Sequence, residues 1–145
     1  MSILKVSTIQ EGLLPLLARV LIALIFIQGA LGKIGGWEGQ ASYMSRHGLR
    51  FIPPLLGAAL AIEALGVLCL LLGAGARAAA AIMFAYLMVV SVLLHDFWGV
   101  TDPMAAGMRQ TEFLKNMGIG GGLLLIAAFG PGRWALRPTG GPRFR

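Results

Sequence analysis

The chain has 145 residues, of which 57% are hydrophobic and only 12% are charged, and its mean hydropathy is +0.80. This composition excludes a disordered chain and argues strongly against a soluble domain. The net charge of +6 does not indicate nucleic-acid binding, because the cations are spread over loops and tail instead of forming a stripe with aromatic residues.

Four apolar stretches have roughly the length that a helix needs to cross a bilayer, about 20 residues. They run over Leu13–Gly32, Pro53–Gly73, Ala76–His95 and Phe113–Phe129. Backbone groups in lipid must be hydrogen-bonded within the segment, and the alternation of a membrane barrel strand is absent. The sequence therefore predicts an all-α fold, a bundle of four transmembrane helices that forms a single integral membrane domain. The first stretch is long, contains Arg19 and lacks a clear cleavage site, so we expect a retained helix and not a signal peptide.

The first connection is long enough to hold structure of its own. Trp37, Ala41 and Met44 recur at helical spacing, and Gly48 offers a helix stop. This pattern predicts a short amphipathic helix lying at the membrane interface between spans one and two.

The other connections differ in length. Gly73-Ala74-Gly75 is so short that spans two and three must form an antiparallel hairpin. The third connection, over residues 96–112, is polar and predicted to be irregular, with Asp102-Pro103 as a turn signal. The tail over residues 131–145 is basic and is expected near the lipid surface.

Four spans put both termini on one side of the membrane. Six cations fall on that side: Lys5, Arg77, Arg133, Arg137, Arg143 and Arg145. Five fall on the other: Lys33, Arg46, Arg50, Arg109 and Lys115. Because basic residues accumulate on the cytoplasmic side, this difference favours cytoplasmic termini.

Charged residues lie well inside three of the apolar stretches, namely Arg19 in the first, Glu63 in the second and Lys115 in the fourth. Each costs at least about 2.5–3.5 kcal/mol at bilayer depth, so the protein must compensate for it. From its position Arg19 lies about 10 Å deep and Glu63 near the midplane, so we expect the two to pair. The pair either fixes helix register only, or Glu63 and Arg19 relay a proton in a polar cavity.

A second polar cluster is predicted at the mouth opposite the termini. Its members are Gln28, Lys33, His95, Asp96, Trp98, Lys115 and Asn116. Individually they have simpler interpretations, because lysines extend to the interface, tryptophans sit at the headgroup level and a histidine can favour a helix C-terminus. Together they form a candidate site for an anionic or quinone-like head group. No metal site is predicted, since the chain has two histidines and His47 lies in another loop.

The only cysteine, Cys69, lies in an apolar run and is interpreted as a small core residue. No intramolecular disulfide, CxxC redox pair or cysteine metal cage is therefore available within the chain.

The chain also resembles the DoxX family, over roughly residues 14–136. The resemblance is carried by Arg19 with Gly29 and Gly32-Lys33, Glu63 with Gly66 and Leu70-Leu71-Leu72-Gly73, His95-Asp96-Phe97-Trp98, Phe113-Leu114-Lys115-Asn116 with Gly121-Gly122, and Gly130-Pro131-Gly132-Arg133. It implies a four-helix protein of the bacterial inner membrane. The family's namesakes are small subunits of a thiosulfate:quinone oxidoreductase, and other members are linked to membrane complexes that handle thiol or oxidative stress. The sequence departs from many relatives at Ala135-Leu136-Arg137, where they carry a serine and an acid.

These observations lead to one functional hypothesis and two alternatives. The hypothesis is a redox accessory subunit that holds a quinone or related small molecule with Lys115, Asn116, His95 and Trp98. Electrons would come from a partner oxidoreductase, because no haem, flavin or iron–sulfur motif is visible. The alternatives are a non-catalytic membrane anchor or assembly factor and a small-molecule transporter that works as a homo-oligomer. Whether the chain is itself an enzyme stays open.

Overall fold

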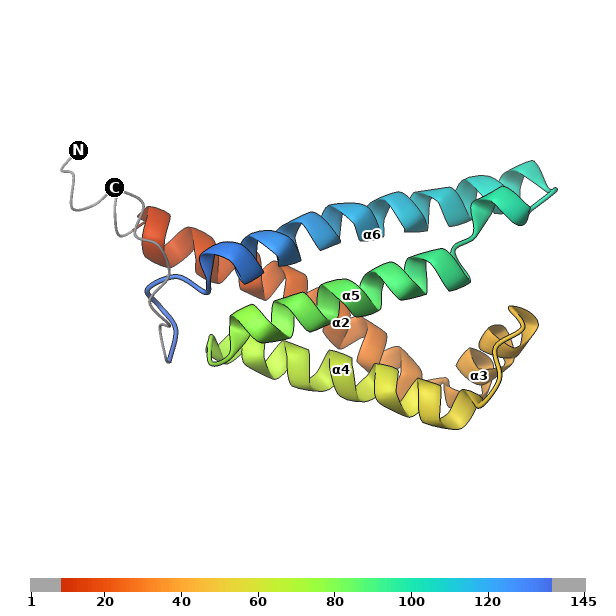
Figure 1. The fold of residues 1–145 in the computed structure, drawn as a ribbon, viewed down its shortest axis with the longest axis horizontal. Helices are drawn as coiled ribbons and strands as arrows, with labels where there is room; N and C mark the ends of the chain where they lie inside the picture. The colour runs from red at the N-terminus through yellow and green to blue at the C-terminus, as the bar shows by residue number, and fades with distance from the viewer. Residues whose placement is uncertain (1–8, 137–145) are drawn as a thin grey trace.

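A computed structural model describes residues 9–136, and every regular element in that range is a helix (Figure 1). The elements are η1 (Ile9–Leu13), α2 (Leu14–Gly35), α3 (Trp37–Arg46), α4 (Ile52–Leu72), α5 (Ala76–Leu94), η2 (Phe97–Gly99) and α6 (Pro103–Phe129). Four helical segments are long and apolar enough to cross a membrane: Ile9–Gly35, Ile52–Leu72, Ala76–Gly99 and Pro103–Phe129. The predicted all-α, four-span bundle with a short helix between spans one and two is confirmed. The predicted tail beyond residue 136, with Arg137, Arg143 and Arg145, and the N-terminal Lys5 lie outside the described residues.

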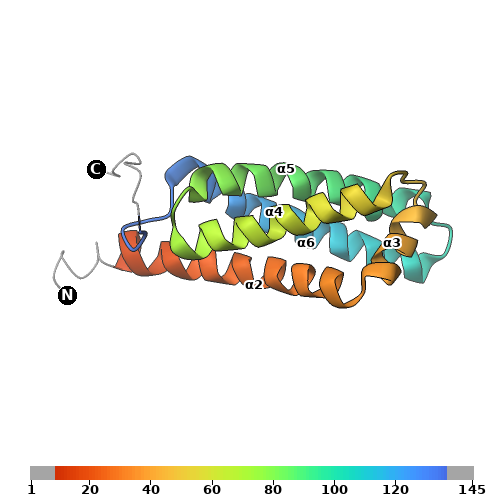
Figure 2. The ribbon, with the colours of Figure 1, turned by 90° about the horizontal axis from the view of Figure 1, so that it is seen from below.

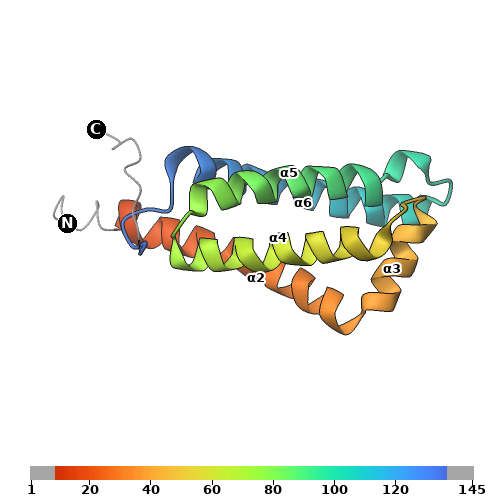
Figure 3. The ribbon, with the colours of Figure 1, turned by 60° about the horizontal axis from the view of Figure 1, so that its bottom comes forward.

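The bundle has two distinct ends (Figures 2 and 3). The start of α2, the α4–α5 turn and the end of α6 lie together, and we call this the terminal end. Helix α3, the end of α5 and the start of α6 lie at the opposite end, which we call the loop end. Helix α4 runs beside α2 and α5, and α5 runs beside α6.

The turn between α4 and α5 confirms the predicted hairpin. Gly73 and Gly75 both adopt left-handed backbone conformations, with φ of 77° and 67°. Only glycine enters this region at little cost, so the chain can reverse within three residues. At Gly73 a Cβ would also lie 2.4 Å from the Cβ of Ala135, so the glycine admits the segment that follows α6.

Helix α6 begins ten residues earlier than the apolar stretch predicted. Asp102 accepts a hydrogen bond from the Ala105 amide at 3.0 Å and Pro103 opens the first turn, so this pair starts a helix. The interpretation of Asp102-Pro103 as part of an irregular connection is therefore wrong. The extra turns hold small, apolar and polar residues, and they extend α6 past the apolar stretch into the loop end.

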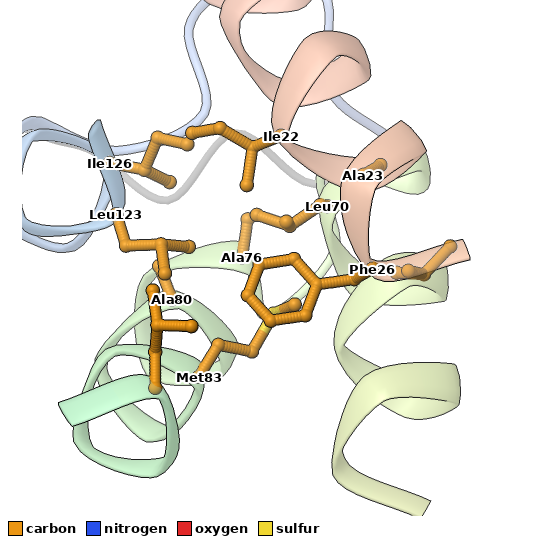
Figure 4. Packing of buried hydrophobic residues seen from close by; sticks show 11 residues of the cluster. Ile22, Ala23, Phe26, Leu70, Ala76, Ala80, Met83, Leu123 and Ile126 are labelled. Carbon is orange, nitrogen blue, oxygen red and sulfur yellow. The ribbon is translucent and has the colours of Figure 1, made fainter. Parts of the chain in front are cut away.

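The core is formed by apolar side chains from all four long helices that point toward one another (Figure 4). Phe26 of α2, Leu70 of α4, Met83 of α5 and Leu123 of α6 are all less than 5% exposed. Gly66 lets α5 approach α4 closely, since a Cβ there would lie 2.3 Å from Met83 Sδ. Many leucines on the outer faces are exposed, as expected of surfaces that contact lipid.

Candidate functional site

Glu63, near the middle of α4, is held by two partners in the described chain. Lys33 Nζ lies 2.7 Å and 2.9 Å from its two carboxylate oxygens, and the Tyr86 hydroxyl donates to Oε1 at 2.7 Å. The side chains of Glu63 and Lys33 are only 5% and 14% exposed. We call these three residues the buried triad. The predicted Arg19–Glu63 pair is wrong, because the lysine from the other end of α2 occupies the carboxylate.

The local sequence of α2 explains how the lysine reaches so far. Gly29 precedes Lys33 by four residues, so both lie on one face of the helix. A Cβ at Gly29 would lie 3.3 Å from the carboxylate oxygens of Glu63. The glycine therefore lets the acid approach the α2 backbone, and Lys33 extends back over it toward the membrane interior.

Arg19 is fully buried and interacts with backbone carbonyls. Its Nη1 donates to the Leu70 carbonyl at 2.9 Å and its Nη2 to the Trp134 carbonyl at 2.6 Å. Leu70 is in the last turn of α4, where carbonyls have no helical partner and the macrodipole favours a cation. Glu63 lies seven residues earlier, about 10 Å along the axis, and is too far away to share the guanidinium.

Arg77, at the start of α5, repeats this arrangement on α6. Its Nε donates to the Ala127 carbonyl at 3.0 Å and its Nη2 to the Ala128 carbonyl at 2.9 Å. Both arginines thus cap the C-terminal end of a neighbouring helix at the terminal end of the bundle. The sequence indicates Arg77 only as a topology signal and does not reveal this contact.

Several of the residues predicted to form one head-group site at the mouth have separate partners in the structure. Asn116 is buried and donates to Ser91 Oγ at 3.0 Å. Lys115 is half-exposed and pairs with Glu112 on its own helix. Trp98 is 60% exposed and packs edge-on against Phe113. Lys33 belongs to the buried triad, and Gln28 is exposed.

The loop end instead holds two adjoining cavities. The larger, of about 530 Å³, is lined by Tyr43, Arg46, His47, Leu93, Asp96 and Arg109. The smaller, of about 360 Å³, is lined by Tyr43, His95, Met108, Arg109, Thr111 and Glu112. Of the predicted site residues, Asp96 lines the first and His95 the second. Within residues 9–136, no three histidine, cysteine, aspartate or glutamate side chains gather closely enough to bind a metal ion.

Hydrogen bonds and ion pairs around the larger cavity connect α3, the end of α5 and α6. Asp96, after α5, accepts from Arg109 of α6 at 2.5 Å. His47 Nδ1 lies 2.9 Å from the Tyr43 carbonyl, and its Nε2 lies 3.8 Å from the Asp96 carboxylate. The Tyr43 hydroxyl donates to the Leu94 carbonyl at 2.7 Å, so α3 is attached to the end of α5.

Three residues of the larger cavity are not predicted from the sequence: Tyr43, Arg46 and His47. The available signal was the four-residue spacing of Tyr43 and His47, which places them on one face of α3, where their rings lie 4.4 Å apart. The spacing does not show that this face of α3 packs against the C-terminal end of α5.

Within residues 9–136, four apolar helices of membrane-spanning length with a buried ion pair between two of them are the architecture of an integral membrane protein. The family model described as DoxX matches residues 14–96, and the model described as SURF4 family matches residues 57–138. The chain is 34% identical over 125 residues to inner membrane protein YphA of Escherichia coli (strain K12), covering 85% of this chain and 87% of that protein. It is 33% identical over 122 residues to inner membrane protein YqjF of the same strain, covering 83% and 87%. The chain therefore belongs to the DoxX family. No solved structure matches it.

Proposed function

We propose that the chain is an accessory subunit of a membrane redox system that binds a quinone or a related small molecule in the smaller loop-end cavity. The single observation that carries this proposal is that His95 shares that cavity wall with Tyr43 and Arg109. Histidine and arginine donate hydrogen bonds to carbonyl oxygens, and Met108 supplies a polarisable apolar surface for a ring. The volume of about 360 Å³ falls within the range of small-molecule sites.

The proposed site keeps His95 from the sequence hypothesis and replaces Lys115 and Asn116 with Tyr43 and Arg109. Lys115 and Asn116 are engaged by Glu112 and Ser91, which supports this choice. Glu63 keeps its proposed role as a proton-handling group, now with Lys33 and Tyr86 as its hydrogen-bond partners. Arg19 has no part in the proposed relay, because its guanidinium lies at the terminal end of the bundle, where it donates to the carbonyls of Leu70 in α4 and of Trp134 after α6.

We further propose that both termini face the cytoplasm, so that the loop end faces the periplasm of a bacterial inner membrane. The excess of six cations over five on the terminal side supports this orientation. A quinone would then enter from the outer half of the bilayer, and a partner oxidoreductase would exchange electrons with it.

Mass spectrometry of the protein purified in mild detergent, with a search for co-purifying quinones, tests the proposal. We expect quinone in the wild type and in Lys115→Ala, and its loss from His95→Ala and Arg109→Ala. Lys115→Ala is the variant that separates the two sites, since Lys115 lines neither cavity, although its ion-pair partner Glu112 lines the smaller one. Loss from Lys115→Ala with retention in Arg109→Ala would assign the ligand to the cluster named from the sequence instead. A wild type without quinone would reject the proposal.

A second candidate function is a non-catalytic anchor or assembly factor. It is favoured by the fact that the buried charges have structural partners, Lys33 with Glu63 and Arg19 with the end of α4. This function predicts that a His95→Ala/Glu63→Gln variant that still folds also retains the activity of its partner complex. The redox proposal predicts that this variant loses it.

A further inference from the structure

We propose that the larger loop-end cavity is a separate binding site for an oxyanion, which is either a free inorganic or organic anion or the phosphate of a lipid head group. The cavity adjoins the one proposed for the quinone but does not depend on it. Its wall carries two arginines and a buried histidine against one acid.

The single acid in the wall is already neutralised. Asp96 accepts from Arg109 Nη1 at 2.5 Å, and this bond uses one of the five N–H donors of the guanidinium. Arg46 makes no ion pair or side-chain hydrogen bond within the described part of the chain. The cavity therefore has an excess positive charge and unused planar donors, which match the oxygens of a phosphate, sulfate or carboxylate.

His47 adds to this charge when it is protonated. Its Nδ1 faces a carbonyl, which can only accept, so Nδ1 carries a hydrogen and neutral His47 has a bare Nε2. Nε2 is buried, has no hydrogen-bond partner and lies 3.8 Å from the Asp96 carboxylate. A proton on Nε2 gives Asp96 a second counter-ion, which leaves more of Arg109 available to a ligand.

Binding of the anion is consequently linked to proton uptake. The groups that face His47 from neighbouring elements are Tyr43 and Arg46 of α3, Asp96 after α5 and Arg109 of α6, and His95 and Glu112 belong to the adjoining cavity. Protonation raises the net charge of the larger cavity by one. An additional charge a few ångströms from the ligand changes the affinity for a monovalent anion about tenfold at an intermediate effective dielectric.

The imidazole resonances of His47 provide the readout, since the chain has only two histidines and a His95→Gln variant assigns them. The purified full chain in a non-ionic detergent is titrated at pH 6 and pH 8 with sulfate, whose charge is constant over that range. Parallel titrations use dihexanoyl phosphatidylglycerol and, as the zwitterionic reference, dihexanoyl phosphatidylcholine. We expect saturable shifts of His47, with an affinity at pH 6 that is about tenfold higher for the monovalent phosphatidylglycerol and about a hundredfold higher for sulfate, which carries two charges.

Arg46→Gln is expected to weaken binding about tenfold, as the loss of a charged hydrogen bond predicts. Arg50→Gln is the matched control, because it removes the same charge four residues later and outside both walls. Saturation by sulfate supports a free anion, and saturation by phosphatidylglycerol alone supports a lipid head group. The proposal is overturned if neither ligand saturates, or if Arg50→Gln weakens binding as much as Arg46→Gln.

Discussion

Replacing Lys33 by methionine tests the buried triad directly. The lysine side chain is 14% exposed and the Glu63 carboxylate is 5% exposed, so the single substitution leaves a buried charge with Tyr86 as its remaining donor. Removing one partner of a buried ion pair destabilises a protein by about 3–5 kcal/mol. We expect a loss of that size in the free energy of unfolding of Lys33→Met.

The double variant Lys33→Met/Glu63→Gln separates the ion pair from the packing around it. Both charges are then absent, and a glutamine oxygen can still accept from the Tyr86 hydroxyl. Because burying a pair of charges is itself costly, we expect the double variant to recover most of the loss. The assay is a double-mutant cycle measured by reversible unfolding in detergent micelles or bicelles.

The exposed pair of Lys115 and Glu112 provides the control, since these side chains are 50% and 46% exposed. Lys115→Met should change the free energy of unfolding by less than about 1 kcal/mol. The reasoning is refuted if Lys33→Met costs no more than Lys115→Met, or if adding Glu63→Gln deepens the loss.

Three further substitutions have defined outcomes. Arg19→Met removes the donor to the buried bond at the Leu70 carbonyl and to the partly buried bond at Trp134, so we expect the free energy of unfolding to fall by about 1–3 kcal/mol for the buried group in the same assay. Gly66→Ala places a Cβ 2.3 Å from Met83 Sδ and should cost about 1–3 kcal/mol, and it should cost less in a Met83→Ala background, so an undiminished cost there would contradict steric overlap. Asp102→Ala removes the N-cap of α6 and should cost about 1 kcal/mol, seen as faster amide exchange in the first turn of α6 and unchanged exchange in α4.

The helices could be predicted because their signals are local. The lengths of the apolar stretches predict the number of spans, and the spacing of Trp37, Ala41 and Met44 predicts α3. The start of α6 was missed because Asp-Pro is compatible with both a turn and a helix N-terminus. The choice depends on whether the following turns pack against another element, and the mixed sequence of residues 103–112 does not reveal that.

The partners of the charges could be predicted only in part. Arg19 and Lys33 are 14 residues apart, so they lie within about 40° on one face of α2, and both can face α4. The estimated depths of the two residues in the bilayer favour Arg19 as the partner of Glu63. The partner of Glu63 is decided by how α2 and α4 lie beside each other. Arg19 lies next to the last turn of α4, and the missing side chain at Gly29 leaves room for the Glu63 carboxylate near Lys33. The relative position of two helices decides these contacts, and the spacing of residues within one helix does not predict it.

The contacts of Arg19 also impose an order on biogenesis. Helix α2 is synthesised first, whereas one acceptor of its guanidinium is at the end of α4 and another is at Trp134, 115 residues later in the chain. Until those carbonyls arrive, the first span carries a cation that the bilayer disfavours. We therefore expect Arg19 of the nascent protein to stay at the membrane interface, or in contact with the insertion machinery, until Trp134 has been made. The full set of contacts at this arginine can therefore form only after the segment that follows α6 has been made.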